Sequence, residues 1–82
     1  MLNMKLKPMK WVKVNQITGE PMKKGNSFEP HDYVCYEERF RIVNNSFIVR
    51  KKAWILTTFG GTELGRFDTL KSAKAEAEDL RH

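Results

Sequence analysis

The feature that most limits how this chain can fold lies in its C-terminal third, where two β-prone runs, a glycine pair and an alanine-rich segment follow one another. Gly60-Gly61 separates the apolar run 54–56 from the run 64–67. Because glycine reaches positive φ without a steric cost, the pair predicts a hairpin turn between two antiparallel strands. Gly65, inside the second run, predicts a bulge or a close backbone approach.

A helix is predicted over residues 69–81. Thr69 can cap its N-terminus, because a threonine hydroxyl accepts a hydrogen bond from a free amide of the first turn. Apolar residues then recur at three- and four-residue steps and so share one face: Leu70, Ala73, Ala77 and Leu80. Since this face is narrow and mostly alanine, we expect the helix to lie close against a flat surface such as a sheet.

Two further strands are predicted in the middle of the chain. Residues 39–43 alternate polar and apolar side chains, as a half-buried strand does. Asn44-Asn45-Ser46 predicts a turn, because asparagine tolerates the left-handed region. Residues 47–56 then predict an extended run with Phe47 and Val49 in the core.

The N-terminal half is less regular. Residues 9–14 predict a first or edge strand, and residues 15–27 a long loop. The β-branched and aromatic content of residues 33–36 favours a strand, although Pro30 could instead begin a helix that runs to about Phe40. Together these elements predict an α+β fold: a three- to four-stranded antiparallel sheet with one C-terminal helix packed on one face.

A chain of 82 residues is long enough for one small domain. We expect a basic N-terminal strand or arm and loop over residues 1–28, a β-meander over residues 33–67, and the helix. The formal net charge is +5. The excess of positive charge lies in the N-terminal segment and on the strands, because the charges of the helix nearly balance.

The cysteine and histidine content argues against a metal centre and against catalysis. Cys35 is the single cysteine, so no internal disulfide can form and a reducing, cytoplasmic location is expected. A structural zinc site needs four ligands, whereas His31, Cys35 and His82 supply three. The sequence shows no nucleophile–base signature, phosphate-binding loop, signal peptide or membrane-spanning stretch. We therefore expect a non-enzymatic protein with no cofactor, metal, membrane or small-molecule partner.

Basic side chains on the predicted strands form the candidate site. If the apolar residues of 39–43 and 47–52 face the helix, the basic residues between them face the other way, because alternate residues of a strand lie on opposite faces. Four cations then share the uncovered face of the sheet: Arg39, Arg41, Arg50 and Lys52. A sheet with such a face could enter the major groove of duplex DNA. Lysines of the N-terminal arm could add phosphate contacts, namely Lys10 and Lys13.

Two alternatives remain open. A sheet covered by a helix on one face needs a polar opposite face, and cations can meet that need without a ligand. Trp54 and Ile55 are adjacent and so cannot share one face of a strand. Either a turn at residues 51–53 resets the register of the strand, or both of its faces carry apolar residues. An exposed Trp54 or Phe59 would then indicate a protein partner.

Two short motifs carry a family resemblance: Leu64-Gly65-Arg66-Phe67, and Phe67-Asp68-Thr69-Leu70 with Ala73 following. On these motifs, residues 39–80 resemble the small β-β-β-α DNA-binding domains of phage and mobile-element proteins, such as the arm-binding domains of tyrosine integrases and AP2-like domains. The resemblance implies that sheet strands contact the major groove, through residues that match by strand position: Arg39, Arg41, Arg50 and Lys52.

The functional expectation follows from the basic face and from this resemblance. Because no catalytic domain follows in the sequence, we expect a small DNA-binding accessory or regulatory protein of phage type. The alternative is a small protein-binding inhibitor or adaptor, of the kind that phages encode against host enzymes.

Overall fold

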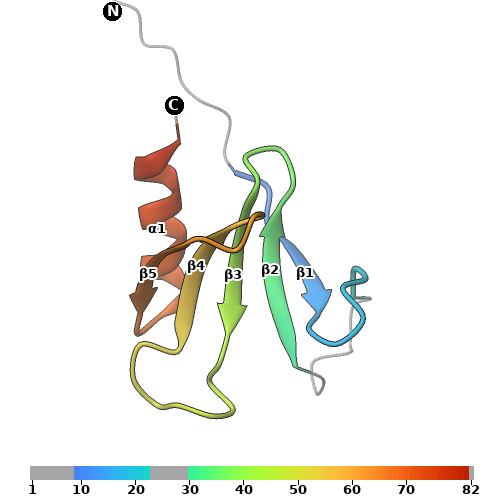
Figure 1. The fold of residues 1–82 in the computed structure, drawn as a ribbon, viewed down its shortest axis with the longest axis vertical. Helices are drawn as coiled ribbons and strands as arrows, with labels where there is room; N and C mark the ends of the chain where they lie inside the picture. The colour runs from blue at the N-terminus through green and yellow to red at the C-terminus, as the bar shows by residue number, and fades with distance from the viewer. Residues whose placement is uncertain (1–8, 23–29, 82) are drawn as a thin grey trace, which may run out of the picture.

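The computed structural model describes residues 9–22 and 30–81, which form an antiparallel sheet followed by one helix (Figure 1). The five strands are β1 (Val12–Asn15), β2 (His31–Cys35), β3 (Phe40–Asn44), β4 (Trp54–Thr58) and β5 (Glu63–Phe67), and the helix is α1 (Leu70–Leu80). Each strand pairs with the next in the order β1-β2-β3-β4-β5. The predicted α+β fold is confirmed, but the sheet has five strands instead of three or four.

Residues 31–35, within the stretch whose sequence is compatible with either a helix or a strand, form strand β2. β2 pairs antiparallel with β1 on one side, where Val12 lies opposite Val34, and with β3 on the other, where Tyr33 lies opposite Ile42. The alternative interpretation, a helix from Pro30 to about Phe40, is therefore wrong. Aromatic and β-branched side chains suit the pleated surface of a strand that is paired with a neighbouring strand along each of its edges.

The prediction of a strand that begins at Phe47 is wrong. Residues 45–53 form the loop between β3 and β4, which we call the β3–β4 loop, and Phe47 and Val49 are exposed instead of lying in the core. The Asn45 carbonyl accepts hydrogen bonds from the amides of Ile48 and Val49 at 2.9 and 3.0 Å and so closes a turn. Turn formation at asparagine thus overrides the β propensity of the apolar residues that follow.

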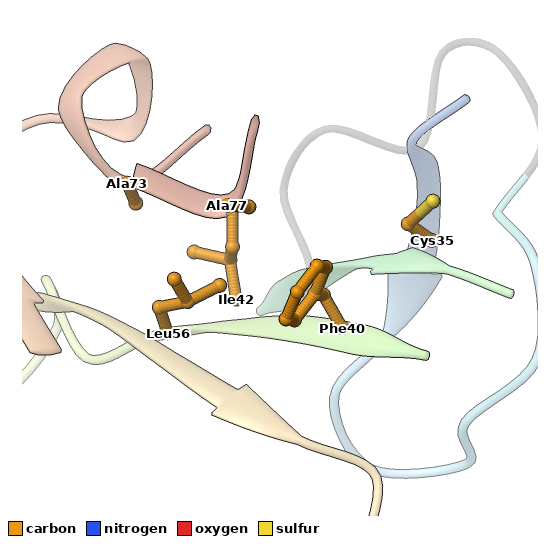
Figure 2. Close-up of a cluster of buried hydrophobic side chains, with 6 residues drawn as sticks. All are labelled: Cys35, Phe40, Ile42, Leu56, Ala73 and Ala77. Atoms are coloured by element: carbon orange, nitrogen blue, oxygen red, sulfur yellow. The ribbon is translucent and has the colours of Figure 1, made fainter. Parts of the chain in front are cut away.

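The helix begins and packs as predicted. Thr69 is the N-cap, and its Oγ1 accepts a hydrogen bond from the backbone N of Ser72 at 3.1 Å. Figure 2 shows Ala73 and Ala77 above the side chains that β3 and β4 direct toward α1, and all six residues of this core cluster are buried: Cys35, Phe40, Ile42, Leu56, Ala73 and Ala77. Because alanine adds little bulk, α1 lies close against β3, β4 and β5. In the described part of the chain, no helix is long and apolar enough to cross a membrane.

Gly65 lies at a β-bulge, as predicted. Leu56 pairs with Gly65 whereas Thr57 pairs with Glu63, so Leu64 is the extra residue of β5. A Cβ atom built on Gly65 would lie 2.9 Å from Cζ of the Phe67 ring, closer than side-chain atoms approach one another. The Phe67 ring therefore lies directly over the backbone of Gly65.

We expect Gly65→Ala to lower the free energy of unfolding by about 1–2 kcal/mol, because the Phe67 ring must leave its place beside the core. Urea denaturation followed by far-UV circular dichroism measures this change. Gly60→Ala is the matched control, since its Cβ would meet only Thr58 Oγ1, at 3.8 Å. Equal urea midpoints for the two variants would show that the ring moves aside without cost.

Candidate nucleic-acid interface

The face of the sheet opposite α1 carries the candidate interface. Val34 pairs with Arg41, and Arg41 pairs with Thr57, so these three side chains share one face. Their strand neighbours Ile42 and Leu56 lie on the face that α1 covers. We call the first face the open face and define it by these residues: Val14, Asp32, Val34, Arg41, Val43, Ile55 and Thr57. Arg41 thus points away from the helix, as predicted.

A buried carboxylate fixes Arg41 in position. Asp32 is 1% exposed, and its Oδ2 accepts hydrogen bonds from Nε and Nη2 of Arg41 at 3.2 and 2.7 Å. Its Oδ1 accepts hydrogen bonds from Gln16 Nε2 at 2.7 Å and from the backbone N of Asn44 at 3.0 Å. A carboxylate can be buried when charged and polar donors satisfy both of its oxygens in this way. Because two nitrogens of Arg41 are held, the orientation of its guanidinium is fixed before any ligand binds.

Beside Arg41 the open face is hollowed. The hollow has a volume of about 250 Å³ and is lined by Val14, Gly19, Val34, Tyr36, Arg41 and Phe59. Tyr36 and Phe59 are 52% and 49% exposed, and their ring centroids lie 6.2 Å apart with an interplanar angle of 81°. We call this site the Tyr36–Phe59 hollow. It combines an apolar floor, two accessible aromatic rings and one fixed cation.

The topology of the sheet explains why these two rings meet. Tyr36 begins the β2–β3 turn (residues 36–39) and Phe59 begins the β4–β5 turn. In a meander, alternate turns lie at the same end of the sheet, and here only β3 runs between β2 and β4. The β3–β4 loop lies at the opposite end, as Figure 1 shows.

The structure does not bring the four predicted strand cations together. Arg39 lies in the β2–β3 turn with φ 60°, whereas Arg50 and Lys52 are exposed in the β3–β4 loop. The five residues of β3 separate these two positions, which corresponds to roughly 16 Å along the strand. Of the four, Arg41 is the one whose side chain lies on the open face. The prediction that all four share a face failed because Arg39 lies in a turn and because the β3–β4 loop, which contains Arg50 and Lys52, replaces the expected start of a strand.

The remaining predicted residues are also dispersed. Lys10 is exposed just before β1, and Lys13 pairs with Tyr33, which places it on the face opposite Arg41. Trp54 packs against the core on the helix side, with its ring centroid 6.2 Å from that of Tyr33. Since Phe59 lines the hollow, Trp54 and Phe59 do not form one partner surface. The rest of the predicted basic arm, residues 1–8 and 23–28, lies outside the described residues, as does His82.

At the edge strand β5, a second arginine is engaged by a neighbouring acid. Arg66 Nε and Nη2 donate to the Glu63 carboxylate at 2.9 and 3.0 Å. This hydrogen bonding lowers the pKa of Glu63 and raises the pKa of Arg66. Because both side chains are in solvent, the pair contributes little to stability. Arg66 pairs with Ile55 and so shares the open face, but it lies on the edge strand. Arg41 lines the Tyr36–Phe59 hollow and is therefore the cation best placed for a ligand there.

The residues that shape the hollow were not all identified from the sequence. Asp32, Gln16 and Tyr36 were not predicted as site residues, although the position of Asp32 in the sequence indicates a special role. Asp32 stands inside the β-prone run 31–35, two residues before Val34 and so on the same face of the strand. An acidic residue at such a position indicates a buried carboxylate that requires a cationic partner.

Cys35 is fully buried on the helix side of β2 and belongs to the core cluster. Its thiol therefore does not line the Tyr36–Phe59 hollow.

No family model, no curated protein and no solved structure matches this chain. Its function is therefore inferred from the open face itself.

Proposed function

We propose that the protein binds nucleic acid, without catalysing a reaction, and that the Tyr36–Phe59 hollow is the contact site. The observation that carries this proposal is the pair of half-exposed rings beside a guanidinium that Asp32 holds in place. Bases stack on aromatic side chains, and a guanidinium can bind phosphate or stack on a base. The net charge of +5 favours encounter with a polyanion.

The hollow favours an unpaired base as the ligand. A base in a duplex is stacked and paired, so its faces are inaccessible to Tyr36 and Phe59, whereas a single strand can turn a base into the hollow. The sequence-based expectation of duplex binding depended on cations that lie on strands. Arg50 and Lys52 lie in a loop at the far end of β3 instead. We therefore propose single-stranded DNA or RNA as the preferred partner, with an accessory or regulatory role.

The double variant Tyr36→Ala/Phe59→Ala is expected to weaken binding to a short single strand by about tenfold to a hundredfold, because both stacking surfaces are lost. Fluorescence anisotropy with labelled single-stranded DNA, single-stranded RNA and duplex DNA, repeated over a salt series, measures this effect. The wild-type affinity should fall as salt rises, since bound Lys and Arg release counterions from the phosphates.

Phe47→Ala is the matched control, because it removes an aromatic ring that is at least as accessible, at the opposite end of the sheet. It should leave the affinity for nucleic acid unchanged. Absence of binding by the wild type at low salt would exclude the proposed function. An affinity that drops equally in Phe47→Ala and in the double variant would exclude the hollow as the site.

A further inference from the structure

The β3–β4 loop presents an apolar tip followed by three cations. Phe47, Ile48 and Val49 are 61%, 82% and 40% exposed. Arg50, Lys51 and Lys52 come directly after them and are exposed as well. In Figure 1 the loop extends beyond the sheet at the end opposite the β2–β3 turn. This surface is therefore separate from the Tyr36–Phe59 hollow.

Hydrogen bonds give the loop a defined shape. Besides the turn that the Asn45 carbonyl closes, the backbone N of Asn45 donates to the Ala53 carbonyl at 2.9 Å and that of Ser46 donates to Asn44 Oδ1 at 3.0 Å. At the other side of the loop, the backbone N of Lys52 donates to Asp68 Oδ1 at 2.7 Å, just before α1. The loop backbone is thus tied at both ends while three adjacent apolar side chains stay in water. A contiguous exposed apolar surface of this kind marks an interaction site.

We propose that the β3–β4 loop docks onto an anionic lipid bilayer. Phe47, Ile48 and Val49 enter the boundary between headgroups and acyl chains, while the three cations contact anionic headgroups. Docking of this kind is peripheral and requires no membrane-spanning segment. It adds a second interaction to the proposed function and does not depend on it.

Charge is the first reason for choosing this partner. Residues 45–53 contain no Asp or Glu, so the three cations have no acid within the loop. Outside the loop, Asp68 accepts a hydrogen bond from the backbone N of Lys52. The loop is therefore complementary to an anionic surface.

The order of the side chains is the second reason. An anionic bilayer has charge outside and an apolar layer beneath, and in the loop three exposed apolar side chains are followed directly by three exposed cations. A wedge into duplex DNA inserts a side chain between base pairs at the cost of unstacking them, and it would leave the other two apolar side chains in a polar groove. A bilayer accepts all three together. Because the loop lies at one end of the sheet, it can enter the interface by about 5–10 Å while the sheet stays in water.

Co-sedimentation of the full chain with vesicles tests this proposal. The test needs two kinds of vesicle: phosphatidylcholine alone, and an equal mixture of phosphatidylcholine and phosphatidylglycerol. The wild type should bind the mixed vesicles, and less so as salt rises. Ile48→Ser should weaken that binding by about tenfold, because it removes the most exposed apolar side chain of the loop. Replacement of Arg50, Lys51 and Lys52 by glutamine should remove the preference for the anionic vesicles.

Phe59→Ala is the matched control and separates this inference from the proposed function. It should keep vesicle binding and lose affinity for single-stranded nucleic acid, whereas Ile48→Ser should show the reverse. Both side chains are well exposed, so both variants should fold, and thermal melting checks this.

Three outcomes would overturn the inference. The first is absence of wild-type binding to the anionic vesicles at low salt, and the second is vesicle binding that Ile48→Ser does not change. The third is a loss of nucleic-acid binding in Ile48→Ser, which would make the loop a nucleic-acid contact instead. If the first outcome is accompanied by a concentration-dependent dimer that Ile48→Ser abolishes, the loop makes a contact between copies of the chain instead.

Discussion

Replacement of Leu56 by alanine is expected to lower the free energy of unfolding by about 3–5 kcal/mol. Leu56 is fully buried in the middle of the five-residue strand β4, between β3 and β5 and beneath α1. The residues of α1 above it are Ala73 and Ala77, which are too small to fill the space that the mutation leaves. A domain of this size has a total stability of about 4–12 kcal/mol, so the mutation should remove a large part of it. Urea and thermal denaturation measure the loss.

Ile55→Ala is the matched control for this effect. Ile55 is the neighbour of Leu56 on β4, but its side chain lies on the open face and is only half-buried. It should lose clearly less stability than Leu56→Ala, because less apolar surface returns to water and the remaining space is open to solvent. A larger loss for Ile55→Ala would place the main core on the open face and contradict the packing of α1.

Replacement of Asp32 by alanine is expected to cost about 2–3 kcal/mol of stability and to weaken nucleic-acid binding by the molecules that remain folded. The buried backbone N of Asn44 loses its acceptor, whereas Arg41, whose side chain is 39% exposed, can regain water. Without its carboxylate partner, Arg41 is no longer held at the hollow. Urea denaturation measures the first effect, and anisotropy at a temperature where the variant is folded measures the second.

Asp32→Asn separates the two effects. The amide keeps an oxygen that can accept from Gln16 and Asn44, but it carries no charge to hold Arg41. It should therefore lose less stability than Asp32→Ala while showing a similar loss of affinity. If both variants bind single strands as well as the wild type does, the orientation of Arg41 has no part in recognition.

The elements that the sequence predicted well depend on local chemistry. The turn at Gly60-Gly61 forms with Gly61 at φ 94°, where a side chain would be strained. Thr69 caps α1 through a residue three positions away. In both cases the residues that decide the structure are neighbours in the chain, so their pattern is sufficient.

The open face could not be predicted in the same way, because its organising contacts join distant residues. Asp32 bonds to Gln16, Arg41 and Asn44, which lie 16, 9 and 12 positions away. Alternation along one strand predicts which residues share a face, but not which of them find a partner on another strand. In the β3–β4 loop, by contrast, the local pattern predicted a strand that does not form. The turn predicted at Asn45 does form, but the chain then continues as a loop to residue 53, although the apolar residues 47–49 favour a strand.

The order of the strands has a consequence for how the chain folds. Every strand pairs with its successor, so hairpins close over short segments, namely residues 36–39, 45–53 and 59–62. Contacts between near neighbours in the chain are associated with fast folding. The connection from β1 to β2, residues 16–30, is the longest between paired strands and has the largest closure entropy. We expect β1 to join last, so that Gln16 completes the hydrogen bonding of Asp32 in the final step of folding.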